Sequence, residues 1–249
     1  MENDLRILVG LGVTLLLVML RLEAERFGTA EYDEPVRGRR PSILRRITWY
    51  VLGVGGVTLL LFVHPTAEQS LFLQVGDRSG IVLALIIGGI GVGQAVALAY
   101  LHYHRLRFPD VASYPGALAN EIITAFIDEA TFRGAVLGYF LWAGANPSMA
   151  ILGQAVVYAL ATRLGAPGRD KYMLVLALLI GLVCGWATML TGGIGAAFLG
   201  HAITRVAVFL TTGHAGQPPA RGTEIEDIEK RRRMPDGWRA VDRGSARER

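Results

Sequence analysis

Long apolar runs separated by short polar blocks make up most of the amino-acid sequence. The runs have the length of a helix of about 20 residues, which crosses a hydrocarbon core about 30 Å thick. A helix on the surface of a soluble protein carries a polar stripe, and most of these runs have none. The pattern therefore predicts an all-α, polytopic transmembrane helical bundle of about seven spans, rather than a soluble protein with buried helices. The predicted spans are 5–20, 47–63, 81–103, 117–141, 148–163, 172–190 and 193–212.

The chain is expected to divide into three parts along its length. Residues 1–116 hold the first three spans with basic loops, and residues 117–212 hold the core helices in which polar residues gather. Residues 213–249 form a charged tail of mixed sign. We expect this tail to be solvated and partly helical or disordered. Contact between its basic run at 231–233 and anionic lipid heads is an alternative.

Basic residues alternate with the predicted spans from one side of the membrane to the other. They lie in segments 21–46, 104–116 and 163–171 and in the tail. The loop 142–147 and the turn near Thr191 have no charge, and the loop 64–80 has one basic residue, Arg78. Cytoplasmic loops carry the excess of lysine and arginine in membrane proteins. The pattern therefore predicts an N-terminus outside and a cytoplasmic C-terminus.

The composition fits this interpretation. Hydrophobic residues make up 52% of the 249 residues and charged residues only 18%, whereas soluble domains carry about 25% charged residues. The net charge of +4 would suit a nucleic-acid partner, but the basic residues flank the spans. Membrane lipids are therefore the expected partners and nucleic acid is not, and the expected location is the plasma (inner) membrane of a bacterium, as a multi-pass protein.

The lone cysteine, Cys184, lies inside an apolar run. A single cysteine allows neither an internal disulfide nor a zinc site built from several cysteines. It is interpreted as a small buried hydrophobic residue. No cofactor is predicted, and nothing in the sequence supports a divalent metal.

Ionisable residues gather inside two of the predicted spans, and no other span has a comparable set. Each costs at least about 2.5 kcal/mol at the bilayer centre and is a functional candidate for that reason. They are Glu121, Asp128, Glu129 and Arg133 in the fourth span and His201 and Arg205 in the seventh. His102 and His104 are weaker candidates, because they lie at the cytoplasmic end of the third span.

Helix geometry sorts these candidates. Asp128 lies about 16 Å and His201 about 12 Å along their spans at 1.5 Å per residue, so both are expected near the bilayer centre, facing each other across a polar cavity. Glu129 and Arg133 are four residues apart and are expected to pair. Adjacent carboxylates point about 100° apart, so one can pair with arginine while the other acts on water as a general base, with a histidine that polarises the water or stabilises an oxyanion.

The same ionisable residues would also suit two roles that involve no hydrolysis. A buried salt-bridge network can serve only to fix helix packing. A proton- or ion-coupled transporter also uses carboxylates inside the membrane. Against the transporter, the acidic residues crowd on one predicted helix, and the sequence shows no inverted repeat or broken pair of helices.

At these positions the sequence resembles the CAAX protease and bacteriocin-processing (CPBP, or ABI) family of intramembrane peptidases. The family's first motif, Glu-Glu-x-x-x-Arg followed by Gly, is matched by Asp128-Glu-Ala-Thr-Phe-Arg-Gly134. Its second motif, Phe-x-x-x-His, is matched by Tyr158-Ala-Leu-Ala-Thr162, and its last, His-x-x-x-Asn or Asp, by His201-Ala-Ile-Thr-Arg205. The similarity covers about residues 117–210, and it predicts the arrangement of the core helices.

The resemblance implies an intramembrane endopeptidase of the CAAX or bacteriocin-processing type, acting on a membrane-embedded peptide or a lipidated protein. It implies catalytic roles for Asp128, Glu129, Arg133 and His201, in which the first acidic residue and the first histidine activate a water. The last histidine and the asparagine would stabilise the oxyanion. Family members trim prenylated CAAX proteins, and bacterial members are linked to bacteriocin maturation or immunity.

Three motif positions depart from the family pattern. Asp128 is one methylene shorter than glutamate, and a displacement of 1 Å in a catalytic group can cost about 100-fold in rate. Thr162 replaces the histidine that would accept a proton. Arg205 replaces the asparagine and would place a permanent charge beside the carboxylates, where it can neutralise Asp128. The alternative function is therefore a catalytically inactive member that serves as a membrane scaffold or immunity-type protein.

Overall fold

The structure is a computed structural model that describes residues 2–29, 43–104, 106, 108–109, 115–167, 171–216, 222 and 225. Most of the predicted tail, including the basic run at 231–233, lies outside the described residues. Every regular element in the described part of the chain is a helix. The elements are α1 (Glu2–Leu22), α2 (Ile43–Val63), α3 (Ala67–Ser70), α4 (Gly80–Tyr103), α5 (Pro115–Asp128), η2 (Glu129–Val136), α6 (Leu137–Trp142), α7 (Pro147–Leu164), α8 (Tyr172–Thr191) and α9 (Gly195–Thr212).

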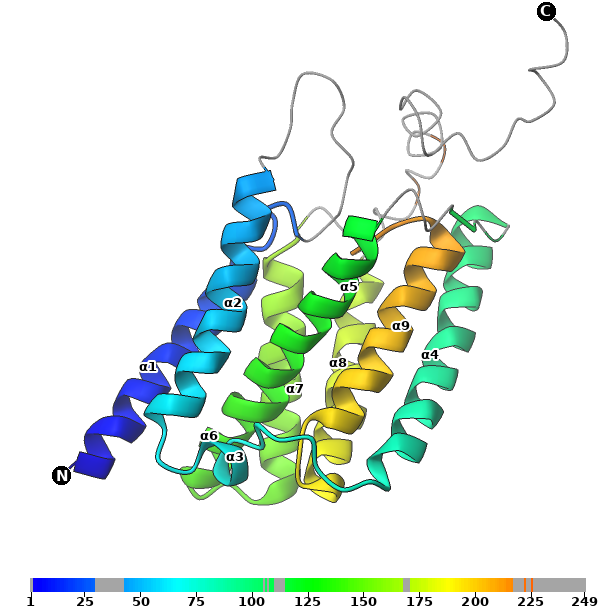
Figure 1. Ribbon diagram of the computed structural model, residues 1–249. Helices are drawn as coiled ribbons and strands as arrows, with labels where there is room; N and C mark the ends of the chain where they lie inside the picture. Colours follow the sequence, from blue (N-terminus) through cyan, green and yellow to red (C-terminus); the bar gives the residue numbers. More distant parts are fainter. Residues whose placement is uncertain are drawn as a thin grey trace, which may run out of the picture.

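The long helices lie side by side as a bundle, which confirms the predicted fold class (Figure 1). Helices α1, α2, α4, α8 and α9 are each long and apolar enough to cross a membrane. The segments α5, η2 and α6 follow one another without a break and coincide with the predicted fourth span. Helix α7 coincides with the fifth, and begins at Pro147 because Asn146 caps it by accepting a hydrogen bond from the Met149 amide, 2.9 Å. The exact number of spans stays a prediction.

The outer surface of the bundle is apolar, and charged side chains lie in its interior beside an apolar core. Leu16, Phe62 and Ile90 are 69%, 76% and 67% exposed on its outer surface. The fully buried side chains include Asp128, Glu129 and Arg133. Because lipid can solvate the first group and not the second, this distribution fits a bundle that spans a membrane.

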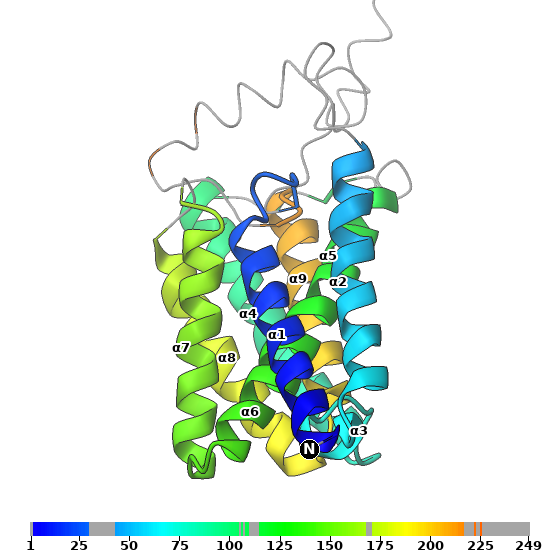
Figure 2. The ribbon, with the colours of Figure 1, turned by 90° about the vertical axis from the view of Figure 1, so that its left-hand side faces the viewer.

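Helix α9 lies inside the bundle, and small residues bring its neighbours close to it (Figures 1 and 2). Gly88 and Gly91 of α4 face Ile203 and Thr204 of α9, and a Cβ atom added at Gly91 would overlap the Thr204 hydroxyl. Gly200 of α9 packs in the same way against Ile87. Lipid tails are as apolar as the helices, so no hydrophobic effect drives the helices together. Close approach of the backbones at small residues stabilises the bundle through van der Waals contacts instead.

The segment that follows α2 closes one end of the bundle, whereas the sequence predicts only a loop there. Its short helix α3 is followed by an extended stretch whose Leu71 and Leu73 enter the core beside Ala130 and Ile194. The Gln74 carbonyl accepts a hydrogen bond from the Ile194 amide, 3.0 Å. The same segment packs against the fourth span, since a Cβ atom added at Gly134 of η2 would lie 2.8 Å from the Leu73 side chain. It thereby holds the π-helical part of that span in place.

The described helices run alternately between the two ends of the bundle (Figure 1), and the charge pattern predicts which end faces the cytoplasm. Ser148 lies at the same end as α3, and Lys171 lies at the opposite end, and both are exposed. We predict that a cysteine at position 148 reacts with an impermeant thiol reagent on intact cells and that one at position 171 does not, in a Cys184→Ala background. The Cys184→Ala protein alone is the control for background labelling. Labelling at position 171 without lysis would reverse the predicted orientation.

Candidate functional site

The polar residues of the fourth and seventh predicted spans meet inside the bundle, where α5 and η2 face α9. Asp128, Glu129 and Arg133 are fully buried, and His201 is 4% exposed. They form two connected chains of contacts, one centred on Glu129 and the other on Asp128.

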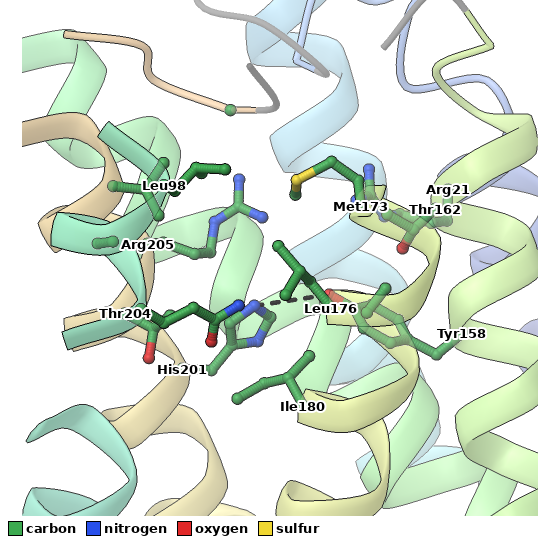
Figure 3. Close-up of a pocket in the computed structure, with 15 residues that line it drawn as sticks. Arg21, Leu98, Tyr158, Thr162, Met173, Leu176, Ile180, His201, Thr204 and Arg205 are labelled. Carbon is green, nitrogen blue, oxygen red and sulfur yellow. Dashed lines mark hydrogen bonds between the residues drawn. The ribbon is translucent and has the colours of Figure 1, made fainter. Parts of the chain in front are cut away.

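Glu129 joins η2 to α9. Its Oε1 atom lies 2.6 Å from His201 Nδ1 and 3.1 Å from Arg133 Nη1. The Arg133 guanidinium lies 4.0 Å above the ring of Tyr158 of α7, a cation–π arrangement. The Tyr158 hydroxyl lies 3.5 Å from His201 Nε2 (Figure 3). The pairing of Glu129 with Arg133 agrees with their four-residue spacing, and the contacts fix the orientation of the His201 ring.

Asp128 points to a different set of partners. Its Oδ1 atom lies 3.1 Å from Arg21 Nε of α1, and its Oδ2 atom lies 3.9 Å from Arg205 Nη1. The structure thus contains the predicted contact between Asp128 and Arg205, as a long ion pair. It does not bring Asp128 to His201 as the depth argument expects, because Glu129 occupies that place.

Arg205 extends this second chain toward α2. Its Nε atom lies 3.1 Å from Glu121 Oε2. The other Glu121 oxygen accepts a hydrogen bond from Asn120 Nδ2, 2.9 Å, and the Asn120 side-chain carbonyl accepts one from the Tyr50 hydroxyl, 2.6 Å. Tyr50 lies outside the motifs, and its partner is a side chain 70 positions away in the sequence.

The charges of the site are matched in number. Three carboxylates, Glu121, Asp128 and Glu129, face three guanidiniums. The guanidiniums belong to Arg21, Arg133 and Arg205, whose side chains are between 0% and 12% exposed. An unpaired ion would be costly at this depth. The pairing offsets the cost of placing these charged groups in the membrane interior.

The helix that carries Glu129 and Arg133 is a π-helix over Glu129–Val136, between α5 and α6. The apolar pattern predicts an α-helix throughout the fourth span. The sequence does not indicate the wider π-helical turn, because a π segment needs no particular charged residue and no turn residue. Such segments interrupt α-helices frequently at functional sites, and this one begins between the two carboxylates.

A cavity of about 80 Å³ lies beside His201, toward the end of the bundle at which α1, α4, α7 and α9 finish and α8 begins (Figure 3). A buried water needs about 10–15 Å³ by this measure, so the cavity has room for several waters. Its polar lining includes Arg21, Tyr158, Thr162, His201 and Arg205. Among the described residues that line it there is no carboxylate.

Two of the candidates predicted from the sequence lie apart from this cavity. His102 is buried at the end of α4, where its neighbour Tyr103 forms a 2.8 Å hydrogen bond with His214. His104 follows it and is exposed, in a left-handed backbone conformation. Neither lines the cavity. In the described part of the chain, no group of three or more His, Cys, Asp or Glu side chains is arranged to hold a metal ion.

Arg21 is the site residue that sequence reasoning missed. The charge pattern assigns it to the basic segment that follows the first span, yet it is 4% exposed and belongs to the last turn of α1. Its position between Leu20 and Leu22, at the end of the apolar run, is the signal that could have indicated burial. The site therefore draws on the N-terminal part of the chain as well as on residues 117–212.

The fold and this buried ionic cluster define a multi-pass helical membrane protein with a polar site in its interior. Residues 110–207 match the family model described as Rce1-like: type II CAAX prenyl endopeptidase Rce1-like. The match confirms the resemblance to the CPBP family over that segment, which carries Asp128, Glu129, Thr162 and His201 but not Arg21. No curated protein and no solved structure matches the chain.

The pair formed by Glu129 and Arg133 gives a first test of the site. Removal of one partner of a buried ion pair typically costs about 3–5 kcal/mol. Arg133→Ala should therefore lower the thermal midpoint and the folded yield in detergent, whereas Arg78→Ala, at an exposed arginine, should change neither. The double variant Glu129→Gln with Arg133→Gln should be milder than Arg133→Ala. Unchanged thermal stability of Arg133→Ala would show that the pair has no structural role.

Arg21 gives a second test, because the sequence pattern and the structure assign it different environments. Arg21→Gln leaves Asp128 with only the 3.9 Å contact to Arg205 and should lower the thermal midpoint by an amount similar to Arg133→Ala. Adding Asp128→Asn should restore part of the loss. Arg26→Gln is the matched control, since Arg26 is 83% exposed. Equal effects of Arg21→Gln and Arg26→Gln would contradict the buried contact.

Proposed function

We propose that this protein is an intramembrane endopeptidase in which the Glu129–His201 pair activates water in the cavity. The observation that carries the proposal is the 2.6 Å contact between Glu129 Oε1 and His201 Nδ1, combined with the position of His201 in the cavity lining. The match of residues 110–207 to a type II CAAX prenyl endopeptidase family supports membership of an intramembrane protease class.

In this proposal His201 is the general base. A carboxylate 2.6 Å from Nδ1 favours the tautomer in which Nδ1 carries the proton and donates a hydrogen bond to Glu129. Nε2 then carries the lone pair, and a water in the cavity reaches it by displacing the Tyr158 hydroxyl, which lies 3.5 Å away. The water transfers a proton to Nε2 as its oxygen attacks the peptide carbonyl carbon, and the same proton later passes to the leaving amine. Arg133 keeps Glu129 in place through the ion pair.

The positive side chains of the cavity supply the second requirement of peptide hydrolysis. A tetrahedral intermediate carries an oxyanion that fixed hydrogen-bond donors stabilise. Arg205 lies one helical turn after His201 and lines the same cavity, where its N–H groups replace the amide donor of the family's asparagine. Arg21 and the Tyr158 hydroxyl are further donors in the lining. Thr162 cannot accept a proton near neutral pH, so it cannot activate water as the histidine of the family's second motif does. The Glu129–His201 pair activates the water instead.

Asp128 has a positioning role in this proposal rather than the role of base that the resemblance implies. It does not line the cavity, and its two oxygens face Arg21 and Arg205. It holds these guanidiniums at the cavity wall. The substrate class is a membrane-embedded peptide or a lipidated protein that enters from the end of the bundle nearest the cavity.

A second candidate function is a non-catalytic scaffold or immunity-type protein. The observation in its favour is that Asp128, the water-activating position of the family, is closed off by two arginines. In that case the ionic cluster serves only to fix the packing of α1, α5 and α9.

Cleavage by the purified full chain separates the two functions. Reconstituted with a mixture of membrane peptides, the wild type should produce fragments that mass spectrometry detects. Glu129→Gln and His201→Gln should each lower the rate by about 10²–10⁴-fold, the usual contribution of a general base. Asp128→Asn should lower it less, because the Glu129–His201 contact stays. Folding of each variant is monitored by its thermal midpoint.

Two outcomes would contradict the peptidase. Wild-type cleavage that survives both Glu129→Gln and His201→Gln would place the chemistry elsewhere. Complete inactivity of the wild type, together with gain of cleavage in the double variant Thr162→His with Arg205→Asn, would identify a peptidase fold whose chemistry has been lost and would support the scaffold.

A further inference from the structure

The cavity beside His201 has a charged lining of one sign. Arg21 and Arg205 reach it from different helices, and among the described lining residues no acidic side chain accompanies them. The balancing carboxylates stand behind the arginines: Asp128 and Glu121 contact them through the Nε atoms, at 3.1 Å each. The cluster as a whole is neutral, but its positive layer faces the cavity.

The guanidiniums of these arginines offer donors to the cavity. In Figure 3 the Arg205 guanidinium projects into the space between α9 and α8, and Arg21 lies across it beside Thr162. A guanidinium has five N–H donors, and the 3.1 Å contacts of Arg21 and Arg205 with the carboxylates involve only their Nε atoms. Donors that face a low-dielectric cavity need acceptors, because an unsatisfied buried polar group is costly.

The remaining wall of the cavity is apolar. Leu98 of α4 and Leu176 and Ile180 of α8 belong to its lining. Helix α4 packs along α9 and has few contacts with α8, so the apolar wall lies where two helices of the bundle are loosely joined. A ligand with an anionic head and an apolar chain is complementary to this lining, because its head can contact the arginines and its chain can contact the apolar side chains.

We infer that this cavity is a binding site for a small oxyanion of the phosphate type, either free or as the head of a single-chain anionic lipid. The cavity of about 80 Å³ holds on the order of five water-sized groups, which is the number of heavy atoms in a phosphate group. Arginine suits this ligand because its planar fork of N–H donors matches two oxygens of a phosphate. The Thr162 and Tyr158 hydroxyls in the lining are additional donors. Binding of this kind does not depend on peptide hydrolysis.

Ligand-dependent thermal stability of the full chain in an uncharged detergent tests this site, with the intrinsic fluorescence of its four tryptophans as the readout. Lysophosphatidate at about 100 times its dissociation constant should raise the thermal midpoint by about 5 °C or more. Lysophosphatidylcholine, whose head is zwitterionic, should not. Inorganic phosphate is the second probe: a comparable rise with phosphate assigns the site to the free oxyanion, and a rise with lysophosphatidate alone assigns it to the lipid.

Two variants tie the effect to the cavity. Leu176→Phe fills space without a change of charge, and the double variant Glu121→Gln with Arg205→Gln removes one cation together with its anion. Both should lose the rise, and Arg26→Gln, at an exposed arginine, should keep it. No rise with either probe in the wild type would overturn the inference. So would an equal rise in both cavity variants, or an equal rise with lysophosphatidylcholine.

Discussion

Six ionisable side chains lie deep in this helical bundle, and they can coexist there because each carboxylate faces a guanidinium. Isolated, each group would prefer water by several kcal/mol. Glu121, Asp128 and Glu129 come from the fourth span, as does Arg133, whereas Arg21 and Arg205 come from α1 and α9. The requirement for charge matching therefore dictates which helices must meet, and it sets the rotation of α9 so that His201 and Arg205 face inward.

Close packing of the backbone makes this meeting of helices feasible. Glycines of α4 and α9 allow the two helices to approach until a Cβ atom would not fit at Gly91. The extended stretch after α3 presses Leu71 and Leu73 into the core beside η2. The charged residues thus lie between surfaces that pack tightly, and the cavity lies on one side of them. Water or a ligand in that cavity meets His201 and the arginines but not the carboxylates.

The long helices were predictable from the sequence because apolar length is a local property, and the observed helices begin and end near the predicted bounds. The contact of Glu129 with Arg133 was predictable for the same reason, since spacing along one helix fixes it. The contact of Arg21 with Asp128 was not, because it joins helices that lie far apart in the sequence. The choice of Glu129 over Asp128 as the partner of His201 also depends on how η2 and α9 are rotated, which no spacing rule gives.

The three altered motif positions form one consistent set when their contacts are considered together. An asparagine is neutral, so its replacement by Arg205 adds a cation that must be balanced in a medium of low dielectric. Glu121 and Asp128 supply that balance, and Asp128 also balances Arg21. Both Asp128 oxygens face guanidiniums, so the proposed mechanism assigns water activation to another group. In the proposed mechanism that group is Glu129 with His201, because their contact is made through Nδ1 and His201 lines the cavity. Thr162, elsewhere in the same lining, no longer needs to be a base.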